Sequence, residues 1–143
     1  MKRSIIPKLA FKALKDAELN IANQGTFSNE SLEKLYSYFD ETFLLATELL
    51  EKCKIQQFST PDRLRKIYKI SVNDEYYTVF DNINFCMCED FQLAVLNKKS
   101  QITCKHVLAV NIAKVTKNVS NESITPLMYE NFLNEQIHCL YDT

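Results

Sequence analysis

The chain has 143 residues, of which 46% are apolar, and this is enough material for one domain with a buried core. Its 17 Lys and Arg residues against 18 Asp and Glu residues give a formal net charge of -1, so the chain as a whole does not attract phosphates or anionic lipids. The single glycine, Gly25, excludes a phosphate-binding loop and a dinucleotide-binding turn, because both need several glycines.

Two amphipathic helices are predicted in the first part of the domain, residues 1–53. The first covers residues 6–22, where apolar side chains recur at helical spacing, and Gly25 is placed as its stop. The second runs from about residue 29 to about residue 52 and carries a long aromatic stripe. We favour core packing for this stripe, although exposed members such as Tyr36 or Phe39 would also suit a partner interface.

The next two parts of the domain are predicted to be a sheet with a metal-binding module, residues 55–118, and a linker with a helix, residues 119–143. Strands rich in β-branched and aromatic residues, separated by turn-forming clusters, are expected to form a small antiparallel sheet. The expected elements are strands at 55–59, 66–72 and 76–80, an apolar run at 91–96 that fits a strand or a helix, a helix at 105–117, a polar linker at 118–125 and a helix at 126–140. The chain is therefore predicted to be a single α+β domain, residues 1–143.

Four metal-ligand residues cluster in the sequence as Cys86-Met87-Cys88, fifteen intervening residues, and Cys104-Lys105-His106. Residues two apart in an extended strand point to the same face, so Cys86 and Cys88 are able to present both sulfurs to one ion. Cys104 and His106 converge if Cys104 precedes the helix and His106 lies in its first turn. Three thiolates and one imidazole suit Zn²⁺, and we predict one structural zinc ion.

Other interpretations of these cysteines are weaker. Buried thiols without a ligand, or a redox pair of Cys86 and Cys88 in a thiol oxidoreductase, remain the alternatives to zinc. Four protein ligands would close the coordination sphere of the ion, whereas a catalytic zinc keeps one position open, so we expect no enzymatic activity. The remaining candidates, Cys53, Cys139 and His138, are remote in sequence, and the two cysteines are expected to be buried small hydrophobes.

The surroundings of the ligand pairs resemble the SWIM-type zinc finger. The run Cys104-Lys105-His106-Val107-Leu108-Ala109 matches the extended SWIM pattern, in which alanine follows the histidine by three residues. Residues 30–118 further resemble the small SWIM-domain subunits of Shu recombination complexes, in segments that include Ser59-Thr60-Pro61, Arg65-Lys66-Ile67-Tyr68, Tyr76-Tyr77-Thr78-Val79-Phe80 and Phe91-Gln92-Leu93-Ala94-Val95-Leu96.

This resemblance implies a specific function. It assigns the zinc ligands to Cys86, Cys88, Cys104 and His106, and it makes Ala109 a packing position, although an ordinary helical alanine is the alternative. It implies a non-catalytic adaptor that pairs with an ATP-binding paralogue of the RecA-family recombinase. The complex would promote assembly of the recombinase filament on single-stranded DNA during homologous recombination and repair. DNA would be reached mainly through the complex.

The location expected from sequence is the cytosol or nucleus. The N-terminus does not resemble a signal peptide, and the apolar runs are far shorter than the ~20 residues that span a bilayer. We therefore expect no membrane association, and the resemblance to a recombination subunit implies the nucleus.

The competing function is direct binding of single-stranded nucleic acid. Arg63, Arg65, Lys66 and Lys69 surround a predicted strand that also carries tyrosines, and bases stack on exposed aromatic rings beside basic grooves. A solvated strand face is the simpler interpretation. We favour the adaptor, because the chain has no large excess of positive charge.

Overall fold

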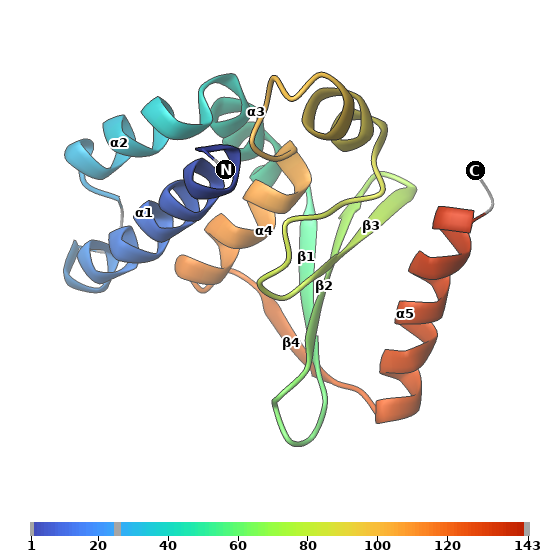
Figure 1. Ribbon diagram of the computed structural model, residues 1–143. Helices are drawn as coiled ribbons and strands as arrows, with labels where there is room; N and C mark the ends of the chain where they lie inside the picture. Colours follow the sequence, from blue (N-terminus) through green and yellow to red (C-terminus); the bar gives the residue numbers. More distant parts are fainter. Residues whose placement is uncertain (1, 25–26, 142–143) are drawn as a thin grey trace.

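The computed structural model describes residues 2–24 and 27–141 and has an α+β architecture. Its elements in chain order are α1 (Lys2–Gln24), α2 (Asn29–Phe39), α3 (Glu41–Leu50), β1 (Lys54–Ser59), β2 (Lys66–Val72), β3 (Glu75–Phe80), the π-helix η1 (Phe91–Asn97), α4 (Lys105–Val115), β4 (Ser120–Ser123) and α5 (Pro126–Tyr141). Helices α1 to α4 gather on one side of the sheet, and α5 lies on the other side (Figure 1). In the part of the chain that the structure describes, no helix combines the length and apolar character needed to cross a membrane.

The first predicted helix is confirmed as α1, whereas the second prediction, one helix to about residue 52, is wrong. The proposed stop at Gly25 lies outside the described residues. The second helix is broken at Asp40, whose φ of 52° and ψ of -133° lie outside the helical region. The change of direction lets both halves bury an aromatic side chain, since Phe39 and Phe43 are almost fully buried while Tyr36 is 41% exposed. Phe39 is therefore part of the core.

The sheet has the strand order β3-β2-β1-β4 and is mixed, because an unpredicted fourth strand is added to the predicted antiparallel strands. Strands β1, β2 and β3 pair in antiparallel fashion, as predicted. β4 pairs parallel to β1 and lies in the segment that was predicted to be a linker. Its four residues, Ser120–Ser123, are all exposed, so backbone pairing rather than side-chain burial holds this strand. A sequence pattern based on burial could not reveal it.

The two faces of the sheet contact different helices. On the face toward α3 and α4, every second residue enters the main core, which contains Ile55, Tyr68, Ile70 and Val79. On the opposite face, the rings of Phe58 and Phe80 contact Phe132 and Tyr129 of α5, with centroids 5.6 Å and 6.2 Å apart. These two aromatic contacts join the last predicted helix, confirmed as α5, to the sheet.

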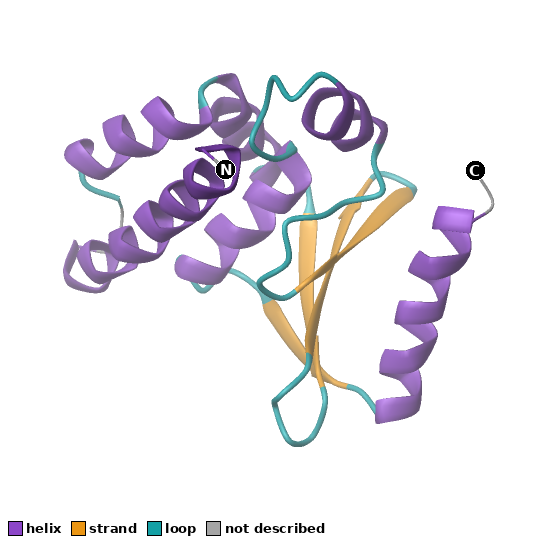
Figure 2. Cartoon of the chain, in the orientation of Figure 1, coloured by secondary structure: helices purple, strands orange, loops and turns teal. Residues whose placement is uncertain are grey.

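Helix α4 is largely buried in the core. It carries seven buried residues and packs against α1, α3 and the sheet. The apolar run before it, for which sequence favoured neither strand nor helix, is η1, in which the N–H of Lys98 donates to the carbonyl of Leu93 five residues earlier. Both segments that flank η1 are loops (Figure 2), and they carry the three predicted cysteine ligands up to the start of α4.

Candidate metal centre

The four predicted ligands, Cys86, Cys88, Cys104 and His106, come together in one buried cluster. Their ligand atoms all lie within 4.8 Å of one another. Nδ1 of His106 lies 3.9 Å from Sγ of Cys86 and 3.9 Å from Sγ of Cys104. Ligands placed tetrahedrally around zinc at a Zn–S distance of ~2.3 Å are separated by ~3.7 Å, so the cluster has the size that one zinc ion requires.

The two ligand pairs reach this point from different local structures. Cys86 and Cys88 lie in the loop after β3 and not in a strand, where we expected them. Cys104 is the N-cap of α4 and His106 is in its first turn, as expected. The change in backbone direction at the cap lets residues two apart face one ion, which a regular helix would not allow.

Backbone N–H groups stabilise the sulfur atoms. The amide of Phe91 donates to Sγ of Cys88 at 3.3 Å, and the amide of Val107 donates to Sγ of Cys104 at 3.5 Å. Three thiolates and one Zn²⁺ carry a formal charge of -1, and the positive end of the α4 dipole lies at Cys104. The helix therefore supplies two ligands and also part of the charge that balances them.

The three thiols cannot all ionise unless a cation is present. Hydrogen bonds from Cys104 and Cys86 lower the pKa of Cys88 strongly. A hydrogen bond with Cys104 lowers the pKa of Cys86, but its hydrogen bond to Cys88, its burial and the charge of Cys88 outweigh this and raise that pKa to about 12. Hydrogen bonds to the same two cysteines, with burial, raise the pKa of Cys104. A divalent ion would remove this conflict by binding all three as thiolates.

Three contacts around the ligands were not predicted from the sequence. The Asn84 amide donates to the carbonyl oxygen of Ile102 at 3.0 Å, and the hydroxyl of fully buried Thr103 donates to Asn84 Oδ1 at 2.6 Å. These bonds join the two loops just before Cys86 and Cys104. The ring of Tyr77 in β3 also packs on His106, with centroids 4.3 Å apart. Asn84, Thr103 and Tyr77 have no spacing that would have identified them, because their contacts depend on tertiary structure.

Of the remaining candidates for metal binding, Cys53 lies outside the cluster. Cys53 is half-buried between α3 and β1, and burial raises the pKa of its thiol. The side chains of His138 and Cys139 lie outside the described residues. Four protein ligands complete a tetrahedral sphere without a position for water, and such a closed site is structural.

The other predicted site residues are placed as follows. Ala109 is fully buried in α4. Arg65 lies over the ring of Tyr129 at 5.5 Å, and Lys69 lies over the ring of Tyr76 at 4.3 Å. Lys66 and Lys69 are three residues apart in β2 and project from opposite faces of the sheet.

Arg63 lies in the exposed turn between β1 and β2, with a φ of 60°. The structure therefore does not bring Arg63, Arg65, Lys66 and Lys69 onto one face.

Comparison with known proteins identifies the module that contains the cluster. Residues 71–115 match the family model described as the SWIM zinc finger, and they include all four ligands. The chain carries a SWIM zinc finger. The finger extends from the end of β2 to the end of α4. Its four donors fit one structural zinc ion.

Similarity to other SWIM proteins extends beyond the finger. The chain is 24% identical over 129 residues to zinc finger SWIM domain-containing protein 7 of Homo sapiens, covering 87% of this chain and 92% of that protein. The Mus musculus protein of the same name is 23% identical over 130 residues, covering 87% and 86% of the two chains. A Dictyostelium discoideum homologue is 30% identical over 96 residues, covering 66% of this chain and 62% of that protein. No solved structure matches the chain significantly. The chain is thus homologous, at low identity, to SWIM domain-containing protein 7.

Proposed function

We propose that this chain is a non-catalytic, zinc-stabilised adaptor subunit of a Shu-type complex. Together with a RecA-family recombinase paralogue, it would promote assembly of the recombinase filament in homologous recombination and DNA repair, in the nucleus. The observation that carries the proposal is the alignment with SWIM domain-containing protein 7 over 87% of this chain, with a complete four-ligand SWIM finger inside it. The recombination role comes from the resemblance of residues 30–118 to Shu subunits.

The chemistry of the site supports a role without catalysis. The four ligands Cys86, Cys88, Cys104 and His106 complete the coordination of one ion, so a substrate or water would have to displace a buried side chain. Gly25 is the only glycine, which leaves nucleotide binding to a partner subunit. In this division of labour, the adaptor supplies a rigid surface and the RecA-like subunit supplies ATP binding.

The distribution of charge supports DNA contact through the complex. The net charge is -1, and the basic residues around β2 are divided between two faces. Lys69 and Arg65 also lie over tyrosine rings of this chain. A nucleic-acid groove needs cations gathered along one path beside exposed rings, and the cations around β2 are instead divided between the two faces of the sheet.

Co-expression with the RecA-type paralogue tests the proposal. We expect the two chains to copurify at a fixed ratio with one zinc per adaptor, and we expect the pair to accelerate recombinase filament assembly on single-stranded DNA. The adaptor alone should bind single-stranded DNA weakly. Failure to copurify, or tight and salt-dependent binding of DNA by the isolated chain, would reject the adaptor in favour of a direct nucleic-acid-binding module.

A further inference from the structure

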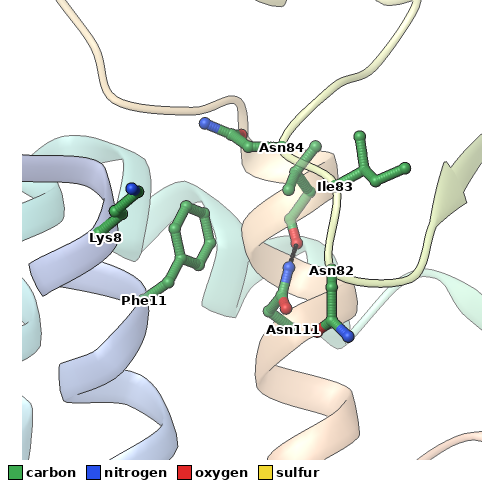
Figure 3. Close-up of a pocket in the computed structure, with 7 residues that line it drawn as sticks. Lys8, Phe11, Asn82, Ile83, Asn84 and Asn111 are labelled. Atoms are coloured by element: carbon green, nitrogen blue, oxygen red, sulfur yellow. Dashed lines mark hydrogen bonds between the residues drawn. The ribbon is translucent and has the colours of Figure 1, made fainter. Parts of the chain in front are cut away.

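A groove lies between α1, α4 and the loop that follows β3. It consists of two adjoining hollows of about 270 Å³ and 450 Å³. Both are lined by Lys8 and Phe11 of α1, by Asn82 of the loop and by Asn111 of α4. Figure 3 shows Lys8 and Phe11 facing the loop and α4 across this groove. The groove is open to solvent along α1, where its lysines are exposed.

One wall of the groove is positively charged. Lys8, Lys12 and Lys15 are four and three residues apart, so they form a row on one face of α1, and all three are exposed. In the described part of the chain, no carboxylate lies within ion-pair distance of these lysines. Glu18 also lines the groove, and Lys114 pairs with Asp81. The groove thus carries a local positive charge on a chain whose net charge is -1.

The floor of the groove is apolar. Leu14 and Val107 are fully buried there, Val115 is partly buried, and Ile83 stands at the rim with 55% of its surface exposed. An apolar floor below a row of cations fits a peptide that places large apolar side chains inward and carboxylates outward.

A nucleic-acid strand fits this groove less well. Single-stranded DNA is held by bases that stack on exposed aromatic rings. Phe11 is the aromatic residue that lines the groove, so the groove offers one ring where successive bases would need several. Charge complementarity together with the apolar floor therefore favours a protein segment.

We propose that this groove binds an acidic segment of a partner protein, with its carboxylates on Lys8, Lys12 and Lys15 and an apolar side chain between Phe11 and Ile83. The inference rests on the proposed adaptor role only in that a partner protein supplies the segment. The Asn111 amide already donates to the carbonyl of Val107 at 2.8 Å, so its oxygen is the atom left to accept an N–H from the bound segment.

Selection from a library of short random peptides on the full-length, zinc-loaded protein tests the proposal. We expect the selected peptides to be rich in Asp and Glu with one or two large apolar residues. Binding should shift the side-chain amide NMR signals of Asn82, Asn84 and Asn111, and it should weaken as salt is raised. Selected peptides without acidic residues, no selected peptides, or shifts confined to other parts of the protein would each overturn the proposal.

A double charge-reversal variant tests whether the lysines of α1 bind the carboxylates of the peptide. Lys12→Glu with Lys15→Glu is expected to weaken the selected peptide about ten-fold or more, because like charges then face each other at the rim. Lys34→Glu with Lys52→Glu is the matched control, since both lysines are exposed, lie outside the groove and change the net charge equally. Equal loss in both pairs, or tighter binding of oligothymidylate than of peptide in the groove, would contradict a peptide site.

The adaptor role has its own readout. Copurification with the ATP-binding paralogue is measured separately, so failure of the groove and failure of the adaptor role give different results.

Discussion

Replacement of Cys88 by serine is expected to release zinc and to destabilise the whole domain rather than one loop. Cys88 is 3% exposed, and its sulfur accepts the Phe91 amide. It also belongs to the same core as the buried residues of α4 and the sheet. Structural zinc contributes ~10–16 kcal/mol of apparent binding free energy in small metal-dependent domains, which is comparable to the whole stability of a typical protein.

The size of the effect follows from what the substitution leaves behind. Serine does not ionise at neutral pH, so the ion loses one of its three thiolates and its affinity falls steeply. Cys86, Cys104 and His106 then remain packed together in the core without the ion that joins them. We estimate a loss of about 4 kcal/mol in the free energy of unfolding. For a chain of this length, each kcal/mol lowers Tm by about 3–5 °C, so Tm should fall by about 12–20 °C.

Calorimetry and metal analysis of the same reduced samples measure this effect. Cys53→Ser is the matched control, because Cys53 is half-buried outside the cluster, and it should retain zinc and nearly the wild-type Tm. Wild-type protein treated with a strong zinc chelator should melt like the Cys88→Ser variant. If zinc-free Cys88→Ser protein melted within about 2 °C of the wild type, the reasoning that zinc organises this core would be refuted.

Three smaller effects are also expected. Asn84→Ala removes the hydrogen bonds that join the two ligand-bearing loops, so zinc should pass to a competing chelator about ten-fold faster, and an unchanged rate would contradict this. Asp81 and Lys114 form an ion pair, and both side chains are about a quarter exposed. A double-mutant cycle of Asp81→Asn and Lys114→Met should therefore give a coupling free energy of only about 0.5–1 kcal/mol. A coupling of zero would show that the pair does not stabilise the fold. A hydrogen bond from the Thr60 hydroxyl holds the pKa of Asp62 below its usual value. The carboxylate therefore stabilises the fold above its unfolded pKa of ~3.9, and this contribution is lost as the pH falls through the lower folded value. An NMR titration of Asp62 that gave an ordinary pKa would disprove this.

The features that sequence predicted are those with a local signal. The strands β1, β2 and β3 follow from β-branched and aromatic residues between turn clusters, and the zinc ligands follow from two cysteine-containing pairs of equal spacing. The predicted start of the last helix at residue 126 is also confirmed, since α5 begins at Pro126 and the Thr125 hydroxyl accepts the Met128 amide at 3.2 Å. In each case, the deciding residues lie close together in the chain.

The features that sequence missed depend on distant partners. The apolar stripe continues through Asp40 without interruption, so periodicity alone predicts one helix where the backbone turns. β4 is four exposed polar residues whose place is set by backbone pairing with β1. The bond between Thr103 and Asn84 spans 19 residues, and neither residue type signals a metal site. These elements are fixed by the fold around them, so no local pattern contains them.

The metal centre and the groove share two structural elements, and this makes their properties dependent on each other. Helix α4 places His106 in the cluster and Asn111 in the groove, while the loop after β3 places Cys86 in the cluster and Asn82 in the groove. Zinc fixes the loop against the helix, so removal of zinc should abolish peptide binding in the groove. Charge reversal at Lys12 on α1 should instead leave the zinc content unchanged, because α1 supplies no ligand. Peptide binding of equal affinity in zinc-free and zinc-loaded protein would show that the groove forms independently of the metal.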